Sequence, residues 1–192
     1  MKATIEKKFV VNQTIEKTWE LLTDPSKIVS CVPGAQLTET LDQNNYKGIV
    51  AMKFGPVAVK YNGQVTFEKR DDANHELTLN GKGMDDKGKG SADMLLTAKL
   101  FQQENQTEVK YSMEVSISGM LAQFGARLIT DVSNQVADQF SNNFKKKAEG
   151  IESSAAGEDA GSLNAISMAG NILKSKLGGL FGGKKEEEEP KS

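Results

Sequence analysis

The chain has 192 residues and a formal net charge of −2. A folded part of about 150 residues buries roughly 70% of its unfolded surface, which is enough for one domain with a core and an appendage. The near-neutral charge and the presence of only two arginines, Arg70 and Arg127, argue against nucleic-acid binding. The single cysteine, Cys31, excludes an intrachain disulfide, and the N-terminal residues lack the apolar stretch of a signal peptide. We expect a cytoplasmic protein, with a peripheral position at the inner face of the cell membrane left open.

The N-terminal segment begins as a strand and continues as two short helices. Residues 2–11 alternate between apolar and polar side chains, which predicts a strand with one buried face. Residues 13–23 carry their apolar side chains at helical spacing. Asp24 and Pro25 then suit the N-cap and the first position of a second short helix, which we expect to end near Cys31.

A meander of antiparallel strands follows between about residues 46 and 117. Apolar side chains recur at every second position, which predicts one buried and one solvated face. The strand that begins at Leu77 is expected to end where the glycines of residues 81–90 begin. That segment lacks the spacing of a nucleotide-binding loop, and no helix follows it, so we expect a mobile hairpin. Asp85 and Asp86 alone would make a weak cation site.

After Ser118 the apolar period changes to that of a helix. From there to about Lys147 we expect one long helix that packs a single apolar stripe on the sheet. The stripe consists of Leu121, Phe124, Leu128, Val132, Val136, Phe140 and Phe144. An antiparallel sheet with one apolar face needs a cover, and this helix is the best candidate. The expected fold is therefore an α+β helix-grip domain over residues 1–149. About seven antiparallel strands curve around a long C-terminal helix, with two short helices after the first strand.

The remaining residues form an appendage to this domain. Residues 150–161 are small and polar, which predicts a flexible linker, and residues 183–192 predict a charged, disordered terminus. Residues 162–182 repeat apolar side chains at helical spacing and predict an amphipathic tail helix. Contact with a membrane, contact with a partner protein and disorder remain open for this tail. Its contact residues would be Leu163, Ile166, Leu173, Leu177, Leu180 and Phe181.

Six segments along the chain carry a family resemblance. They are residues 19–25 (WELLTDP), 31–35 (CVPGA), 53–57 (KFGPV), 61–63 (YNG), 81–83 (GKG) and 118–129 (SGMLAQFGARLI). In this order they resemble the CoxG family of carbon monoxide dehydrogenase subunits, within the START/Bet v1-like, polyketide cyclase/dehydrase-like superfamily. The resemblance covers about residues 2–147. It implies a deep apolar pocket and an accessory role beside a molybdenum hydroxylase of the carbon monoxide dehydrogenase type. We assign no cofactor. The glutamate-rich terminus departs from the family.

The inward side chains of this fold are the candidate ligand contacts, because one helix cannot fill a strongly curved sheet. The candidates are Met52, Phe54, Tyr61, Phe67, Met94, Leu96, Tyr111, Met113, Phe124 and Leu128. In most folds such residues would be plain core. Methionine adapts to irregular apolar shapes, and a tyrosine offers a polar handle inside an apolar site. The resemblance implies a hydrophobic ligand, with a quinone or a lipid favoured.

Groups for catalysis are scarce in this sequence. His75 is the only histidine and lies in a polar turn, and Cys31 lies at the wrong end of its helix for a reactive thiolate, so we expect it to be a packed hydrophobe. The inward positions offer tyrosines but no paired carboxylates. We assign no catalytic or metal-binding residue and expect a non-enzymatic binding protein. Two alternatives stay open: an assembly or membrane-recruitment factor without a ligand, and a polyketide cyclase-like enzyme.

Overall fold

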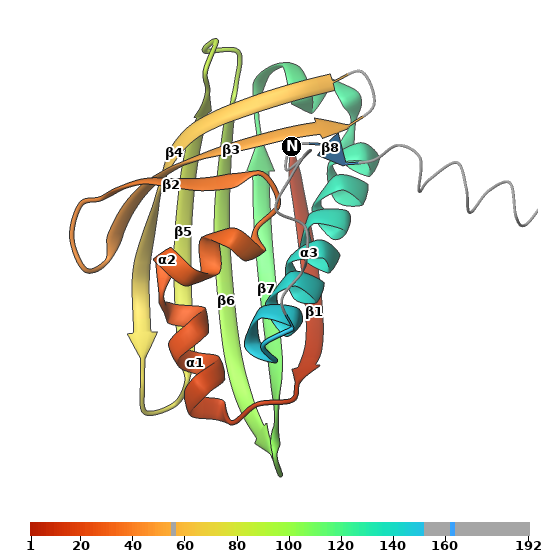
Figure 1. Ribbon diagram of the computed structural model, residues 1–192. Coiled ribbons are helices and arrows are strands. Elements are labelled where there is room, and N and C mark those ends of the chain that lie inside the picture. The colour runs from red at the N-terminus through yellow and green to blue at the C-terminus, as the bar shows by residue number, and fades with distance from the viewer. Residues whose placement is uncertain (55–56, 152–161, 164–192) are drawn as a thin grey trace, which may run out of the picture.

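A computed structural model describes residues 1–54, 57–151 and 162–163, and it forms one curved sheet with helices on its concave side (Figure 1). The elements are β1 (Lys2–Val11), α1 (Ile15–Thr23), α2 (Pro25–Ile28), η1 (Val29–Cys31), β2 (Ala35–Thr40), β3 (Asn45–Phe54), β4 (Val57–Asp71), β5 (Glu76–Asp85), β6 (Ser91–Gln103), β7 (Gln106–Ile117), η2 (Gly119–Phe124), α3 (Ala126–Ala148) and β8 (Ser162–Leu163). The strand order is β1-β7-β6-β5-β4-β3-β2, with antiparallel neighbours. The predicted helix-grip fold is confirmed.

The connection after β1 folds as the local sequence dictates. The Asp24 carboxylate accepts hydrogen bonds from the backbone nitrogens of Ser26, at 3.0 Å, and Lys27, at 3.3 Å, and so caps α2. The hydrogen bond from the Ser26 hydroxyl, with smaller effects of the Lys27 side chain and of these two backbone nitrogens, holds the pKa of Asp24 below its usual value. Trp19 and Leu22 on α1 are buried against the sheet. The two short helices therefore close one end of the concave face.

A row of glycines crosses the strongly curved half of the sheet. Gly48 lies opposite Gly63 in the β3–β4 pair, and Gly63 lies opposite Gly83 in the β4–β5 pair. A Cβ atom on Gly63 would come within 2.4 Å of the Lys82 carbonyl oxygen, closer than side-chain atoms approach the backbone. The absence of side chains along this row lets β3 and β4 bend across the end of the sheet.

The prediction that the fifth strand ends near Gly81 is wrong, because β5 continues to Asp85. Its glycines are packing positions. A Cβ atom on Gly81 would meet the Met94 side chain at 3.2 Å, and one on Gly83 would meet Tyr61 at 3.3 Å. The larger neighbours occupy the space that a side chain on β5 would need.

The long helix differs from the prediction in its start and in its buried face. Residues 119–124 form the 3-10 helix η2, and Gly125, with φ of +89°, separates it from α3. The side chains buried against the sheet are Ile129, Ser133, Ala137, Ser141 and Phe144. Of the predicted stripe, Leu121 and Phe144 are buried, Phe124 is exposed, and the four residues between them are half-buried. The small residues let α3 approach β1 closely and turn the predicted stripe toward one side.

The predicted tail helix differs from the structure at its first residues. Ser162 and Leu163 form strand β8, which pairs parallel with Lys53 and Phe54 of β3. The other predicted tail contacts, Ile166, Leu173, Leu177, Leu180 and Phe181, lie outside the described residues, as do most of the predicted linker and all of the charged terminus. Among the described helices, none has the length and apolar character needed to cross a bilayer.

Candidate functional site

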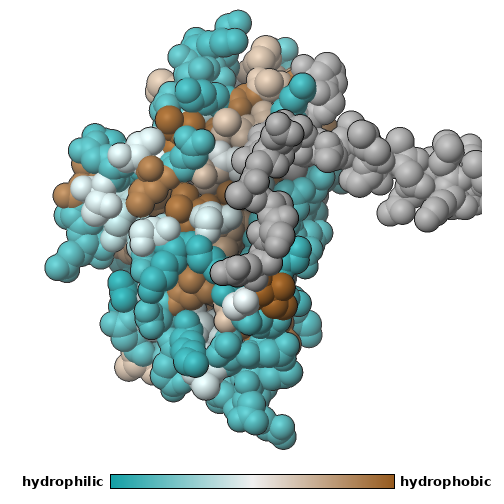
Figure 2. Space-filling model, in the orientation of Figure 1, coloured by the Kyte–Doolittle hydropathy of each residue, from teal (hydrophilic) through white to brown (hydrophobic). Residues whose placement is uncertain are grey.

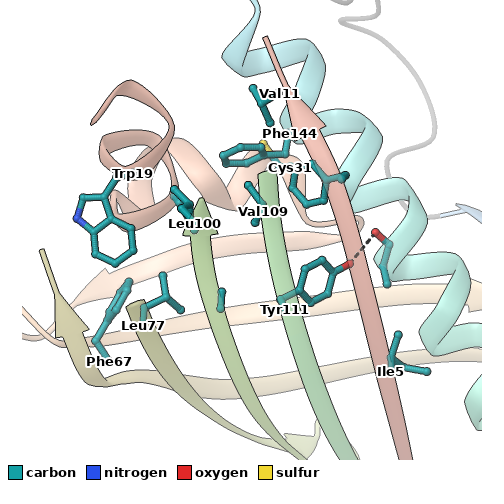
Figure 3. Packing of buried hydrophobic residues seen from close by; sticks show 14 residues of the cluster. Ile5, Val11, Trp19, Cys31, Phe67, Leu77, Leu100, Val109, Tyr111 and Phe144 are labelled. Atoms are coloured by element: carbon teal, nitrogen blue, oxygen red, sulfur yellow. Dashed lines mark hydrogen bonds between the residues drawn. The ribbon is translucent and has the colours of Figure 1, made fainter. Parts of the chain in front are cut away.

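The buried core of the domain is divided into two clusters. The larger lies under α1, η1 and the second half of α3, and Figure 3 shows Trp19, Leu77, Val109, Tyr111 and Phe144 within it. The smaller lies where the first turn of α3 meets the opposite end of the sheet, and it contains Ala3, Val59, Tyr61, Ile117, Leu121 and Ile129. Among the described residues, the fully buried apolar side chains therefore form two separate clusters and not one continuous core.

Half-buried apolar side chains line the inward face beside the two clusters, and some of them pack against one cluster or the other. They share the inward-facing positions of their strands with buried residues and alternate with outward ones. On the sheet they are Val50, Met52, Val65, Met94, Leu96, Met113 and Val115, and on α3 they are Leu128, Val132, Val136 and Phe140. A side chain that points inward and yet stays accessible borders space that the protein does not fill. This apolar set defines the concave site.

Contacts at the end of α3 show which way its half-buried flank points. The Asn143 amide donates to the Cys31 carbonyl oxygen at 3.2 Å, and the Lys147 ammonium donates to the Ser30 hydroxyl at 2.6 Å. Both partners belong to η1, across the concave face from β1 (Figure 1). Val136 lies seven residues, about two helical turns, before Asn143, so the flank that carries it faces the concave site. Figure 2 shows apolar side chains gathered on this side of the molecule.

Two of the inward tyrosines, Tyr61 and Tyr111, differ in their hydrogen bonding. The Tyr111 hydroxyl donates to the Ala137 carbonyl oxygen at 3.1 Å, drawn as a dashed line in Figure 3, and burial raises the pKa of this phenol. Burial, with a smaller effect of the Asp85 charge, also raises the pKa of Tyr61. Within the described residues no hydrogen bond engages the Tyr61 hydroxyl. Tyr111 therefore ties the sheet to α3, and Tyr61 is the better candidate for a polar contact with a ligand.

The predicted ligand contacts fall into three groups. Five border the concave site as half-buried side chains: Met52, Met94, Leu96, Met113 and Leu128. Three are buried in the clusters: Tyr61, Phe67 and Tyr111. The other two are Phe54, the last residue of β3, and Phe124, which is exposed on η2. Their roles as ligand contacts stay predictions.

Several residues of the concave site were not among the candidates. They are Val50, Val65, Val115, Val132, Val136 and Phe140. The same period-two and helical patterns contain them, but the candidate set favoured methionines and aromatic residues. The small residues Ser133, Ala137 and Ser141 are buried against the sheet and so decide which other residues of α3 face the site. This role becomes clear only from the packing of α3 on β1.

The residues with the most reactive side chains take structural roles. The His75 ring packs edge-on against Trp19, with 5.4 Å between ring centroids, in a turn where His75 has φ of +51°. Cys31 is buried, as predicted, and its burial raises the pKa of the thiol. Across the described ranges, no three potential metal-ligating side chains gather into one group.

Two hollows of the surface lie on the outward face of the sheet. The larger, of about 590 Å³, is bordered by charged side chains that include Lys8, Lys110 and Lys99, which are neighbours in register across β1, β7 and β6. The smaller, of about 390 Å³, lies over β2, β3 and β4. Both are open and bordered largely by outward polar residues and backbone, so neither suits an apolar ligand as well as the concave face does.

Solved structures confirm the fold. A conserved protein from Geobacillus kaustophilus matches with a TM-score of 0.70 and 20% identity, covering 77% of this chain and 96% of that one. The Zhui aromatase/cyclase from Streptomyces sp. R1128 matches with a TM-score of 0.58 and 12% identity, covering 82% and 100%. A START superfamily protein from Mycobacterium smegmatis matches with a TM-score of 0.55 and 7% identity, covering 78% and 99%.

A sequence search of curated proteins finds no match. The model of one family, CoxG, whose description is that of a carbon monoxide dehydrogenase subunit, matches residues 8–149. This match spans most of the chain and the whole of the domain from the end of β1 to the end of α3. The chain belongs to the CoxG family of carbon monoxide dehydrogenase subunits.

Proposed function

We propose that this protein is a non-enzymatic carrier that holds a hydrophobic molecule, a quinone or a lipid, in the concave site. Its partner would be a molybdenum hydroxylase of the carbon monoxide dehydrogenase type. One observation carries the proposal: the apolar flank of α3 and the inward side chains of the sheet face each other between two separate core clusters. An apolar surface that the described residues leave partly accessible suits an apolar ligand.

The chemistry of the site supports binding rather than catalysis. Its polar groups are the phenols of Tyr61 and Tyr111, and Tyr111 is engaged with Ala137. Lys7 and Asp138, on β1 and α3, pair with each other at 2.8 Å. Asp85 accepts hydrogen bonds from the backbone nitrogens of its own hairpin. Acid–base catalysis needs a titratable group free to reach the substrate, and the described part of the site offers only phenols.

The family supplies the proposed partner. Its name refers to a subunit of carbon monoxide dehydrogenase. Any dehydrogenase removes electrons from its substrate and has to pass them to an acceptor. A carrier of quinone or lipid beside such an enzyme would work at the inner face of the cell membrane, with the C-terminal tail as the segment that localises it. The short pairing of β8 with β3 brings the beginning of that tail to the edge of the sheet.

A pair of neighbouring substitutions tests the concave site. Met113 points inward and is half-buried, whereas Glu114, the next residue of β7, points outward and is exposed. We expect Met113→Lys to weaken ubiquinone or phospholipid binding at least tenfold, because burying an ammonium against a ligand without a partner is costly. Glu114→Lys should leave the affinity unchanged. Binding would be followed by quenching of the fluorescence of the single tryptophan, or by native mass spectrometry.

Thermal unfolding of both variants serves as the control for folding. If both variants remain folded and bind equally well, the ligand is held elsewhere. If neither the variants nor the wild type binds any quinone or lipid, the assembly-factor alternative replaces the carrier.

A further inference from the structure

The three tyrosines of the chain differ in what their hydroxyl groups contact. The Tyr46 hydroxyl donates to the Gln43 carbonyl oxygen at 2.6 Å, and the Tyr111 hydroxyl donates to the Ala137 carbonyl oxygen at 3.1 Å. Within the described residues the Tyr61 hydroxyl has no hydrogen-bond partner, although Tyr61 is only 7% exposed. A phenol at this depth needs a partner, because a buried polar group that stays unpaired is costly.

The Tyr61 oxygen keeps contact with accessible space. In the described part of the chain, every side-chain nitrogen or oxygen that is shut off from solvent has a hydrogen-bond partner. Because the Tyr61 hydroxyl has none there, its oxygen must border space that a small molecule can enter. Tyr61 is therefore a nearly buried ring with an accessible polar tip.

The neighbours of Tyr61 place this tip at one end of the concave site. Tyr61 is paired across β3 and β4 with Val50, which borders the site. On the side of β5, a Cβ atom on Gly83 would lie 3.3 Å from the Tyr61 Cβ and 3.7 Å from its ring, so the ring lies over backbone that carries no side chain. Tyr61 belongs to the smaller cluster, and Met52 of the concave site packs on that cluster.

The charged residue nearest to Tyr61 in register leaves the hydroxyl free. Asp85 is its partner in the β4–β5 pair. The Asp85 carboxylate accepts hydrogen bonds from the backbone nitrogens of Lys87, at 2.9 Å, and Lys89, at 3.3 Å, within its own hairpin. Burial, with a smaller effect of Asp85, raises the pKa of Tyr61. The phenol is therefore protonated at neutral pH and can donate a hydrogen bond.

The surroundings of this donor are apolar. The other sheet residues that border the concave site are valine, methionine and leucine. Such a lining contacts hydrocarbon of any kind and does not distinguish one apolar molecule from another. A hydrogen-bond donor at one end of the lining can make this distinction, because a ligand without an acceptor would leave the phenol unpaired.

We propose that Tyr61 determines which ligands the concave site selects, by donating a hydrogen bond to an oxygen at the head of the ligand, such as a quinone or ester carbonyl. The head would then lie beside the smaller cluster, and the hydrocarbon part would lie along the apolar flank of α3. This inference rests on the proposed carrier function and names the part of the ligand that the site reads. One such hydrogen bond is worth about fivefold in affinity.

Two ligands that share a decyl chain test the role of Tyr61 in the full-length protein. Decylubiquinone carries carbonyl oxygens on its ring, whereas the ring of decylbenzene has no oxygen. In calorimetric titrations, Tyr61→Phe should weaken the binding of decylubiquinone about fivefold and leave that of decylbenzene unchanged. The matched control is Tyr111→Phe, which removes a phenol that is already engaged with Ala137. It should keep the wild-type ratio of the two affinities.

Infrared spectroscopy of bound decylubiquinone detects the hydrogen bond itself. A donated hydrogen bond lowers the stretching frequency of a carbonyl group. The frequency should therefore be lower in the wild type and in Tyr111→Phe than in Tyr61→Phe. Thermal unfolding without ligand serves as the control for folding. Tyr61→Phe should keep the wild-type midpoint, because its hydroxyl has no partner to lose among the described residues.

The possible failures of this inference and of the carrier function differ. An unchanged ratio of affinities and an unchanged carbonyl frequency in Tyr61→Phe would overturn the role of Tyr61 and leave the carrier function standing. Equal losses for decylubiquinone and decylbenzene would also overturn it, because Tyr61 would then only support the shape of the site. A wild type that binds neither ligand would overturn the carrier function itself.

Discussion

Two adjacent residues of α3 should respond differently to replacement by leucine. Ala137 is 3% exposed and lies against β7, where its carbonyl oxygen accepts from Tyr111. Leucine at this position would force the helix away from the sheet, and overpacking of this kind costs about 1–3 kcal/mol. Val136 lies on the flank that faces the concave site, so Val136→Leu should change the free energy of unfolding by less than about 0.5 kcal/mol.

Urea unfolding followed by circular dichroism measures both effects. A domain of this size loses about 1–3 kcal/mol of stability per molar urea, so a loss of about 2 kcal/mol in Ala137→Leu should lower the midpoint by roughly 1 M. The midpoint of Val136→Leu should stay within about 0.3 M of the wild type. If Val136→Leu is the more destabilised variant, Val136 belongs to the core and the concave site has been misplaced.

Two further predictions concern the sheet and its contact with the helix. Because burial raises the pKa of Tyr111 above its ordinary value of 10.0, the unfolded chain loses this proton first, and stability should fall as pH rises above about 10. Tyr111→Phe should lower the free energy of unfolding by about 1 kcal/mol at neutral pH. Between neutral pH and about pH 11 this variant should lose less stability than the wild type does. An equal loss in both proteins would contradict the assignment of the pH dependence to Tyr111. Gly63→Ala should destabilise by about 1–3 kcal/mol in urea unfolding, because its Cβ atom would lie 2.4 Å from the Lys82 carbonyl oxygen. The matched change Ala58→Gly, at an exposed position of β4, should cost less than about 1 kcal/mol.

The strands and the long helix could be predicted because their periodic patterns are strong. The apolar residues Ile5 and Phe9 on β1, and Val109 and Tyr111 on β7, alternate regularly with polar residues. Only one face of each strand can therefore be buried, which also fixes the register of the pairing. Strand β2 was not anticipated, since its residues 35–40 are mostly polar and lie at the edge of the sheet.

The face of α3 could not be predicted from hydrophobicity. A pattern of large apolar residues indicates what can be buried, whereas Ser133, Ala137 and Ser141 are buried because they are small. The same limit applies to Gly81, which resembles a strand end in the sequence but leaves room for Met94. In both cases the deciding quantity is the distance between two elements, which no single segment of sequence contains.

The central claim is that the concave site holds a hydrophobic molecule, and native mass spectrometry of the freshly purified full-length protein tests it most directly. The account predicts a retained mass of a quinone or a lipid in the wild type and in Glu114→Lys, and its loss in Met113→Lys. A wild type that carries no such mass, even after incubation with ubiquinone and phospholipid, would contradict it.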